Sequence, residues 1–395
     1  MEPEGANEPG GTHNIFDLNL ADVDEDTDLR NDLPPSFSEL EEKHFPLFIS
    51  FDKLCSLIEA DIHRVEQKKK REIWSAKPTL EHKFIDYKEF TDVYWPQFRS
   101  SDRFGLSPSL VYSEILGVIR GYSELMGCAG GYLGRDHHIL GSLANRVSAH
   151  LDVGVKGQIY SISEDYRRLK GARFELDRAD RSHRISEFIT RGMPKDDPDF
   201  RKDLLSIDCL YVDEVQDNLM SDIRLLRQLC KTLENTYWGG DTAQTILAGS
   251  AFQIKDLGAY LYNQVQENLG DNIRRLPPKL APSKFALTVN YRSHKGIVRC
   301  AASIVAILYE LFPESLDELP IETADDTSIR HWPTVVTDAS SQDDAFKGFL
   351  EDLTSSLGAQ QAILVRSEEQ AKQLKSQIAG FCPVLTIAKS KGKSS

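Results

Sequence analysis

The spacing of apolar positions predicts a series of helices along the chain. Leu54, Leu57 and Ile58 recur at helical spacing, and Ser50 is placed to cap that helix at its start. Similar patterns predict helices over residues 108–126, 161–170, 220–233, 295–311 and 368–378. Short apolar runs of strand length occur at residues 207–212, 335–336, 362–365 and 384–387. The alternation of strands with helices in the later part of the chain predicts a parallel α/β sheet.

The apolar run 207–212 leads directly into a cluster of carboxylates and amides, made of Asp213, Glu214, Gln216 and Asp217. Ligands of open α/β sheets bind outside the carboxyl ends of such strands, and Mg²⁺ binds few protein carboxylates together with water and phosphate oxygens. The cluster is therefore a candidate metal and nucleotide site. A structural interpretation stays open, because Asp and Glu also favour the first turn of a helix that follows a strand.

Two further segments follow this cluster. Residues 236–246 read TYWGGDTAQTI, and residues 287–293 read LTVNYRS. Together with DEVQD at residues 213–217, they resemble the motifs DExQD, GDxxQxI and LxxNYRS of the UvrD/Rep-like superfamily 1 helicases. The residues FPLFI at 45–49 and FELDRAD at 174–180 are similar to the large UvrD-like ATP-binding domains of tetratricopeptide-and-ankyrin-repeat proteins. For these last two segments the residues themselves indicate no chemistry.

The resemblance implies an α/β fold made of two incomplete RecA-like P-loop NTPase domains, with a large helical insertion and a disordered N-terminal tail. The expected parts are an acidic tail over 1–34, a helical block over 35–200, the end of the first RecA-like domain over 201–283 and part of the second over 284–395. The tail is expected to be disordered because its polar and acidic composition buries too little apolar area to offset the entropy of ordering.

The resemblance also implies roles for single residues, with ATP and Mg²⁺ as cofactors. Asp213 is expected to hold Mg²⁺, and Glu214 to take the proton of the attacking water. Arg292 resembles the arginine that reaches the phosphates from the second domain, with a structural salt bridge as the other interpretation. The remaining nucleotide-binding positions are Gln216 and Gln244 as sensors of the γ-phosphate, Tyr291 stacked on adenine, and the neighbouring Asp217, Gly240 and Asp241.

The chain departs from the family at its first motif. No Walker A sequence precedes Asp213, and Gly392-Lys393-Ser394 lacks the first glycine and a following helix. Residues 385–392 resemble the start of the family's fifth motif instead. We therefore expect a section of a larger ATP-dependent helicase that translocates on single-stranded nucleic acid, DNA favoured over RNA, and that does not turn over ATP by itself. The alternative is a non-catalytic regulatory or interaction protein.

Composition narrows the possible partners and compartments. The formal net charge of −14 argues against a sequence-independent DNA coat, although a binding groove needs only a local basic and aromatic lining. The aromatic residues between 87 and 98 have near-helical spacing, which favours core packing, and Phe252 is expected either in the core or on a DNA base. The six scattered cysteines are interpreted as reduced packing residues. No membrane span is predicted, and an intracellular location, nucleus or cytoplasm, is expected.

Overall fold

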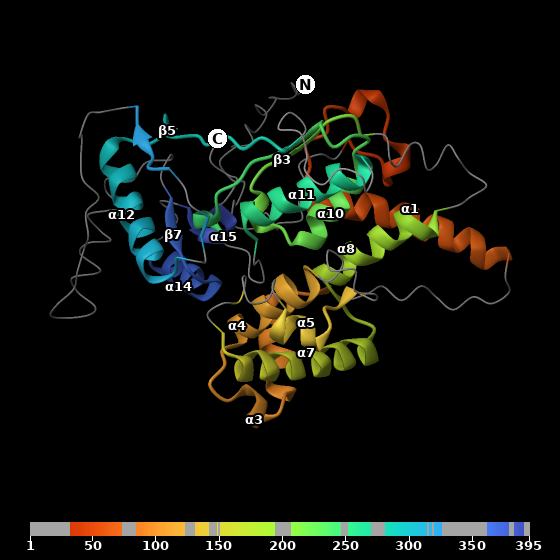
Figure 1. Ribbon diagram of the computed structural model, residues 1–395, viewed down its shortest axis with the longest axis horizontal. Helices are drawn as coiled ribbons and strands as arrows, with labels where there is room; N and C mark the ends of the chain where they lie inside the picture. Colours follow the sequence, from red (N-terminus) through yellow and green to blue (C-terminus); the bar gives the residue numbers. More distant parts are fainter. Residues whose placement is uncertain are drawn as a thin grey trace, which may run out of the picture. The chain divides into compact units, whose positions relative to one another are not determined.

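The computed structural model of the chain describes residues 32–72, 84–122, 131–141, 148, 151–193, 207–245, 252–269, 281–313, 316–317, 320–325, 362–378 and 383–390. The chain divides into two units, residues 33–334 and residues 1–32 with 335–395, and Figure 1 labels many of the described helices and strands. The expected strand 335–336, the sequence Gly392-Lys393-Ser394 and nearly all of the expected tail lie outside the described residues.

Helices make up most of the described part of the larger unit before residue 193. Ser50 caps α1 (Phe51–Glu72), because its hydroxyl oxygen accepts a hydrogen bond from the Lys53 amide at 3.1 Å. The α-helices that follow are α2 (Tyr87–Glu89), α3 (Ser100–Arg103), α4 (Pro108–Ser113), α5 (Arg135–Leu140), α7 (Val153–Arg173) and α8 (Arg178–Glu187). Short 3₁₀ and π-helical segments are η2 (Phe37–Glu39), η3 (Glu42–His44), η4 (Phe90–Tyr94), η5 (Trp95–Gln97), η6 (Glu114–Arg120) and η8 (Phe188–Gly192).

An aromatic core holds η4, α4 and α7 together. The rings of Phe90 and Tyr112 have their centroids 4.9 Å apart, and Tyr94 meets Tyr166 edge-on at 5.1 Å. Phe90, Tyr94 and Phe98 are all buried, so the prediction of core packing is confirmed for these three residues. Rings of this size contribute much of the apolar area that a helical core buries.

The later part of the larger unit alternates short strands with helices. Its elements are β3 (Leu210–Val212), η9 (Val215–Asp217), α10 (Met220–Leu229), β4 (Thr236–Trp238), η10 (Thr242–Gln244), α11 (Ile254–Leu269), β5 (Val289–Asn290), α12 (Lys295–Leu311) and β6 (Thr323–Ala324). Strands β3 and β4 are parallel, with Tyr211 opposite Tyr237. Val212 and Trp238 pack on the core, whereas the two tyrosines are exposed. Phe252 is buried, in agreement with the core alternative for this residue.

The described residues of the smaller unit form a strand pair with a helix against it. Strand β7 (Ile363–Val365) pairs in parallel with β8 (Val384–Thr386), and α14 (Glu368–Ile378) packs on both. Ala371 of α14 and Val384 of β8 are its buried apolar residues among those described. The predicted helix 368–378 is confirmed, whereas Ile387 begins the short helix α15 (Ile387–Ser390) and does not extend β8.

The predicted fold of two incomplete RecA-like α/β domains is wrong. Within the described residues, every sheet consists of two short parallel strands, and helices account for most of the structure. The first of these sheets pairs β1 (Phe84–Ile85) with β2 (Leu176–Asp177). The parallel direction of the strands agrees with the prediction. Apolar runs in the sequence do not show how many strands will join one sheet, and a RecA-like sheet needs more than two.

Several predicted elements have different lengths in the structure. The run 207–212 is a strand only from Leu210, because Asp208 and Cys209 are exposed and Ile207 forms an isolated bridge with Cys230. The predicted helix 108–126 changes from α to π geometry at Glu114, and the predicted helix 220–233 ends at Leu229 because Cys230 is extended. Helix α7 is longer than predicted at both ends, and α12 matches its prediction.

Candidate functional site

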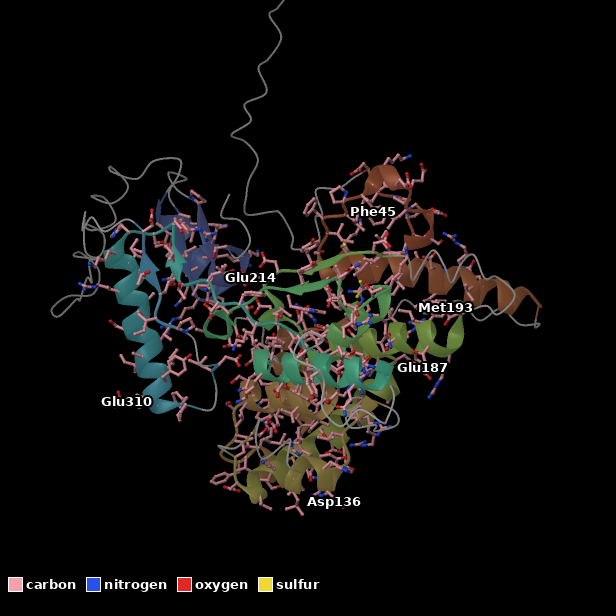
Figure 2. The ribbon with its side chains drawn as sticks, turned by 45° about the horizontal axis from the view of Figure 1, so that its top comes forward. Phe45, Asp136, Glu187, Met193, Glu214 and Glu310 are labelled. Atoms are coloured by element: carbon pink, nitrogen blue, oxygen red, sulfur yellow. The ribbon has the colours of Figure 1, made fainter. Side chains whose placement is uncertain are left out.

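The acidic cluster lies where the two strands of the β3–β4 sheet end. The parallel pairing continues beyond the strands, since Gly239 N donates to Val212 O at 2.8 Å and Val215 N donates to Gly239 O at 2.9 Å. Between these bonds, Glu214 has left-handed backbone angles, with φ 50° and ψ 41°. Left-handed backbone angles at a residue other than glycine cost of order 1 to 3 kcal/mol of folding free energy. Residues with such angles are concentrated at functional sites. Figure 2 labels Glu214 at this turn.

Gln216 joins the ends of the two strands from a fully buried position. Its amide nitrogen donates to Glu214 Oε2 at 2.5 Å, and its amide oxygen accepts from Asp241 N at 3.0 Å. Gly240 lies directly against this amide, because a Cβ built on it would be 2.5 Å from Gln216 Oε1. Gly240 therefore has a steric reason to lack a side chain, and Gln216 has a structural role whether or not it also binds a ligand.

Asp241 organises the turn after β4. Its carboxylate accepts from the Ala243 amide at 2.9 Å and from the Gln244 side chain at 2.8 Å. The next residue, Thr242, accepts from the amide of Asp317 at 3.1 Å. The carboxylate of Asp317 in turn accepts from the amides of Ile254 and Lys255, at the start of α11. Asp317 thus ties the segment after α12 to the segment that carries Gln244.

The predicted metal ligand Asp213 is exposed at the turn. One of its carboxylate oxygens accepts from the amide of Glu214 at 2.9 Å. Asp217 is half-buried in η9, where its amide donates to Glu214 O at 2.9 Å. In the part of the chain that the structure describes, no three His, Cys, Asp or Glu side chains are grouped closely enough to hold a metal ion.

The sequence Asn290-Tyr291-Arg292-Ser293 forms the turn between β5 and α12. Asn290 Oδ1 accepts from the amides of Arg292 and Ser293, at 2.9 and 2.7 Å, and its amide nitrogen donates to Glu322. Tyr291 is 80% exposed. Arg292 is also exposed and, among the described carboxylates, has no ion-pair partner. The structure therefore brings Gln216, Gly240, Asp241 and Glu214 together but does not bring Asp213 into an ion pair with Arg292.

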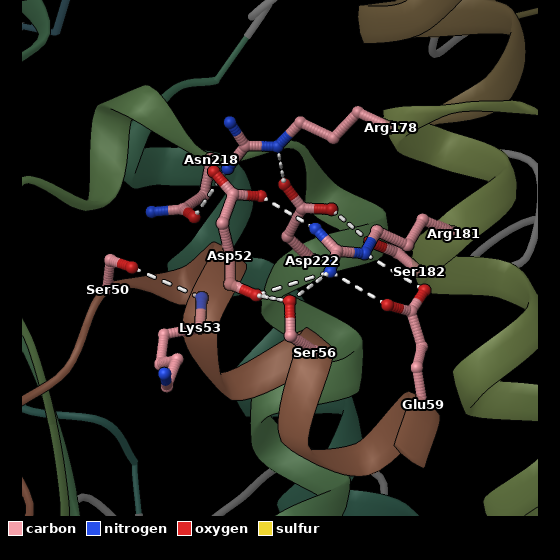
Figure 3. A network of polar contacts seen from close by, with 10 residues as sticks. All are labelled: Ser50, Asp52, Lys53, Ser56, Glu59, Arg178, Arg181, Ser182, Asn218 and Asp222. Carbon is pink, nitrogen blue, oxygen red and sulfur yellow. Dashed lines mark hydrogen bonds and ion pairs between the residues drawn. The ribbon is translucent and has the colours of Figure 1, made fainter. Parts of the chain in front are cut away.

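The segment FELDRAD, for which the sequence indicated no chemistry, leads into α8, whose polar side chains bind residues of α1, α7 and α10. Arg181 of α8 donates to Asp52 at 2.9 Å and to Ser56 at 2.9 Å, and it binds both carboxylate oxygens of Glu59 at 3.0 and 2.8 Å (Figure 3). All three acceptors belong to α1. A paired fork of this kind fixes the orientation of two helices more strictly than a single point charge would.

Arg178 and Ser182, one turn apart on α8, both bind Asp222 of α10. Arg178 Nε donates to Asp222 Oδ2 at 2.8 Å, Ser182 donates to the other oxygen, and Asn218 accepts from Arg178 at 3.2 Å (Figure 3). Asp222 is fully buried and also accepts from the Leu219 amide at 3.0 Å. Buried charges need partners of this kind, because an unpaired one costs several kcal/mol.

The first turn of α8 contains a second buried charge cluster. Asp177 and Asp180 cap the helix reciprocally, and Lys170 of α7 binds both carboxylates, while Arg120 binds Asp180. Burial alone would raise the pKa of Asp177, but Lys170 and Arg120 lower it by more, so this pKa lies well below its usual range. We name the side chains of Asp177, Arg178, Asp180, Arg181 and Ser182 the α8 hub.

A buried Ser, His and Glu cluster was also absent from the sequence interpretation. Ser148 donates to Glu114 Oε1 at 2.6 Å, and His138 Nε2 lies 2.9 Å from the same oxygen. Nucleophilic catalysis requires the imidazole between the hydroxyl and the carboxylate. Here the carboxylate lies between the other two, and Ser148 and His138 are fully buried. The arrangement therefore stabilises the helical core and does not activate the serine.

Helix α12 carries a row of exposed apolar side chains. Val298 is buried, and Tyr309 donates to the carbonyl of Asp317, so one side of the helix faces the rest of the unit. On the other side lie Ile297, Cys300, Ile304, Ile307 and Leu311, which we name the α12 seam; all five are exposed. Exposed apolar side chains that form a continuous row, and not isolated ones, are typical of binding surfaces.

The comparisons with known proteins place the chain beside a much longer human protein. No protein-family model matches the chain. The chain is 28% identical over 316 residues to TPR and ankyrin repeat-containing protein 1 of Homo sapiens. The aligned region covers 78% of the chain and 10% of the human protein. The chain thus spans about a tenth of the length of this relative, whose name refers to TPR and ankyrin repeats and not to a helicase.

These findings correct the helicase interpretation. The assignment to the UvrD/Rep-like superfamily 1 helicases is wrong, and with it the P-loop NTPase fold and the translocation function, because the relative has a repeat-protein name and the described structure is mainly helical. Three short motifs in this order do not by themselves identify a helicase, because Gln216, Asp241 and Asn290 each have a local structural role. The binding of ATP and Mg²⁺ is not tested by these comparisons and stays a prediction, as do the individual roles given to Asp213, Glu214, Gln244 and Arg292.

Proposed function

We propose that the chain is a non-catalytic protein-interaction module that binds its partners through the α12 seam. The observation that supports this proposal is the exposure of the seam itself: five apolar side chains follow one another along a helix that is already held on its opposite side. Exposing such a row to water is unfavourable by roughly 25 cal/mol per Å² of apolar surface. Covering it with a partner therefore stabilises the complex.

Protein partners are proposed in place of single-stranded nucleic acid. The formal net charge is −14, and the α12 seam contains no basic residue, whereas nucleic-acid grooves combine aromatic platforms with positive charge. Among the described residues, no helix has the length and apolar character needed to cross a membrane. Partners that present an apolar helix or groove fit this seam better than a phosphate backbone does.

We also propose an intracellular location, in the nucleus or cytoplasm. Cys55, Cys209, Cys230 and Cys300 are free thiols. Cys55 and Cys230 are buried, as expected for packing residues, whereas Cys209 and Cys300 are exposed, which corrects the interpretation of all cysteines as packing residues. Exposed free thiols are stable in reducing compartments.

The test compares two charge insertions on the same helix. Ile304→Asp places a carboxylate in the seam, and Ala306→Asp places one at an exposed position away from it. Proteins that associate with the tagged chain in cells are quantified by mass spectrometry for the natural chain and both variants. We expect a defined set of proteins to be lost with Ile304→Asp and kept with Ala306→Asp. An unchanged set with Ile304→Asp would refute the proposed function.

A further inference from the structure

The segment that precedes α1 is tied to that helix through Ser38. The amide of Ser38 donates to Asp61 Oδ2 at 2.9 Å, and its hydroxyl donates to Asp61 Oδ1 at 2.7 Å. Asp61 belongs to α1 and is fully buried, so its carboxylate depends on these donors. In the same short turn, η2, Phe37 is buried in the apolar core that includes Leu54 and Ile58 of α1. Ser38 therefore helps to hold an apolar side chain out of water.

The charges around the Ser38 hydroxyl are mainly negative. Asp61 accepts its hydrogen bond, and the next residue is Glu39. Arg64 Nη1 also lies 3.4 Å from Ser38 Oγ. This guanidinium is already shared by two carboxylates, at 2.7 Å from Glu39 and 3.7 Å from Asp61. The Arg64 side chain is 40% exposed, so water screens its charge more than that of the buried Asp61. An added negative charge on Ser38 is therefore repelled more than it is attracted.

The residues after Ser38 are those of a substrate for an acidic-directed serine kinase. Glutamates follow it at one, three and four positions: Glu39, Glu41 and Glu42, all of them exposed. Kinases of this class bind carboxylates at such positions through basic substrate grooves. Glu41 pairs with Lys43 at 3.1 Å, but these side chains are 65% and 66% exposed, and an exposed pair of this kind is weak. The sequence around Ser38 thus fits this class of enzyme.

The backbone at Ser38 can open without the loss of a long helix or a sheet. Ser38 is half-buried in a 3₁₀ turn of three residues, and the residues on either side of that turn, Ser36 and Leu40, are extended. Kinases bind the acceptor in an extended segment, so local opening of this turn is sufficient. Ser56 gives the contrast, because Glu59 lies three positions after it but Ser56 is inside the long helix α1. Ser38 is thus the more accessible of these two serines.

We propose that Ser38 is phosphorylated by an acidic-directed protein kinase, and that the phosphate releases residues 33–50 from α1. The serine oxygen attacks the γ-phosphorus of a nucleoside triphosphate, and the bond from this phosphorus to the β-phosphate oxygen breaks. The hydroxyl proton passes to the base of the kinase, and the nucleoside diphosphate leaves. The product lacks the hydrogen that Asp61 accepts and carries a charge of about −1.5 to −2 beside that buried carboxylate. This site is separate from the α12 seam and does not depend on the proposed function.

The experiment treats the purified full chain with casein kinase II and Mg²⁺-ATP, and mass spectrometry of its peptides locates the phosphate. We expect phosphate on Ser38, and none at this position in Ser38→Ala. Hydrogen–deuterium exchange of residues 36–44 then measures release. We expect phosphorylation to accelerate this exchange by about tenfold or more, because these amides are protected only while the segment is held on α1. Ser38→Ala removes the hydroxyl without adding charge and is expected to have a smaller effect.

Asp61→Asn separates charge repulsion from a general weakening of the segment. An asparagine amide can accept from the Ser38 amide and donate to either a hydroxyl or a phosphate oxygen, so both forms of the variant keep a partner. We therefore expect phosphorylation of Asp61→Asn to leave the exchange of residues 36–44 almost unchanged. Arg64→Gln removes the attraction at a partly exposed position and is expected to increase the acceleration. Circular dichroism verifies that the variants are folded.

Four outcomes would overturn the proposal. The first is a natural chain that takes up no phosphate on Ser38, and the second is a phosphate that leaves the exchange unchanged or slows it, as capture by Arg64 would do. The third is an Asp61→Asn variant that responds to phosphorylation as the natural chain does. The fourth is an Arg64→Gln variant in which phosphorylation accelerates the exchange less than in the natural chain.

Discussion

At the scale of single residues, Gly240 shows how closely the two strand ends approach. A Cβ at this position would lie 2.5 Å from Gln216 Oε1 and 2.7 Å from Val215 Cγ1. We expect Gly240→Ala to lower the free energy of unfolding by about 1 to 3 kcal/mol, because the neighbours must move to admit the methyl group. Gly258→Ala is the control, since nothing lies within 4 Å of its Cβ in α11, and it is expected to stabilise the protein by about 0.5 to 1 kcal/mol. Urea unfolding of both variants measures the difference; equal effects would contradict the steric explanation.

Protonation of His183 is expected to make the folded state less stable in mild acid. Burial, and then the positive charge of Arg120, lower the pKa of His183 to about 4, although Asp177 and Asp180 act in the other direction. The unfolded chain takes up this proton below about pH 6.5, and the folded chain does so only below about 4. The folded state therefore loses stability as the pH falls from 6.5 to 4, by up to about 1.4 kcal/mol per pH unit.

The measurement for His183 is the urea midpoint at several pH values in this window. His183→Gln removes the titrating group and is expected to have a flatter pH dependence between pH 6.5 and 4 than the natural chain. Asp177 also loses stabilising free energy below about pH 5, where the unfolded chain begins to protonate it, but it does so equally in both proteins, so the difference between the two slopes reports on His183. Identical slopes for the two proteins would show that His183 is not buried as the structure places it.

The residues of the candidate site could be predicted from the sequence, but their contacts could not. The order of acidic, glycine and asparagine motifs located Gln216, Gly240 and Asn290, all of which have defined structural contacts. The sequence did not show that the Gln216 amide spans from Glu214 to Asp241, because that contact requires the parallel register of β3 and β4. A resemblance in motif letters therefore did not distinguish a structural hydrogen bond from a ligand contact.

At the scale of elements, α8 is joined to α10 by a buried ion pair that no pattern in the sequence predicts. Asp222 binds Arg178 and Ser182, and none of its surface is exposed. We expect Asp222→Ala to cost about 3 to 5 kcal/mol, because Arg178 is left without its carboxylate. Lys88→Ala is the control: the Lys88–Asp92 pair is largely exposed and its loss is expected to cost at most about 1 kcal/mol. Guanidinium unfolding measures the loss of stability in both variants. Similar losses for Asp222→Ala and Lys88→Ala would refute the importance of the α8 hub.

Helices were predicted more reliably than strands, for a physical reason. The period of α12 and α14 is contained in their own residues, and both match their predicted bounds. A strand depends on a partner elsewhere in the chain, and Asp208 and Cys209 fall outside β3 although they belong to the same run of residues as Leu210. The α8 hub did have a local signal: Asp177 and Asp180 are spaced as a capping box, and Arg178 and Arg181 are one turn apart.

At the scale of the whole molecule, the fold prediction failed because it relied on motif order and not on the number of strands. The α12 seam, in contrast, was readable as a 3-4-3-4 spacing in the sequence, but only the structure shows that these side chains are exposed and not in a core. Exposure is a property of the complete fold. A pattern of apolar positions predicts which face of a helix will be covered, but not whether the covering partner belongs to the same chain.

We expect the whole chain to show no sustained ATP turnover. The sequence has no Walker A loop to hold the β-phosphate, and Asp241 binds the Gln244 side chain that a nucleotide would have to displace. Steady-state phosphate release is measured with Mg²⁺, with and without single-stranded DNA, for the natural chain and for Glu214→Gln. Turnover that depends on Glu214 would contradict the non-catalytic proposal.

The pairing of β1 with β2 has a consequence for the order in which the molecule folds. Phe84 pairs with Leu176, 92 positions later (176 − 84), and the helices from α2 to α7 lie between them. Closing so long a loop for a ladder of two residues is entropically unfavourable until those helices are packed. The β1–β2 contact is thus expected to form after the rate-limiting step, and substitutions in it to accelerate unfolding while leaving the refolding rate almost unchanged.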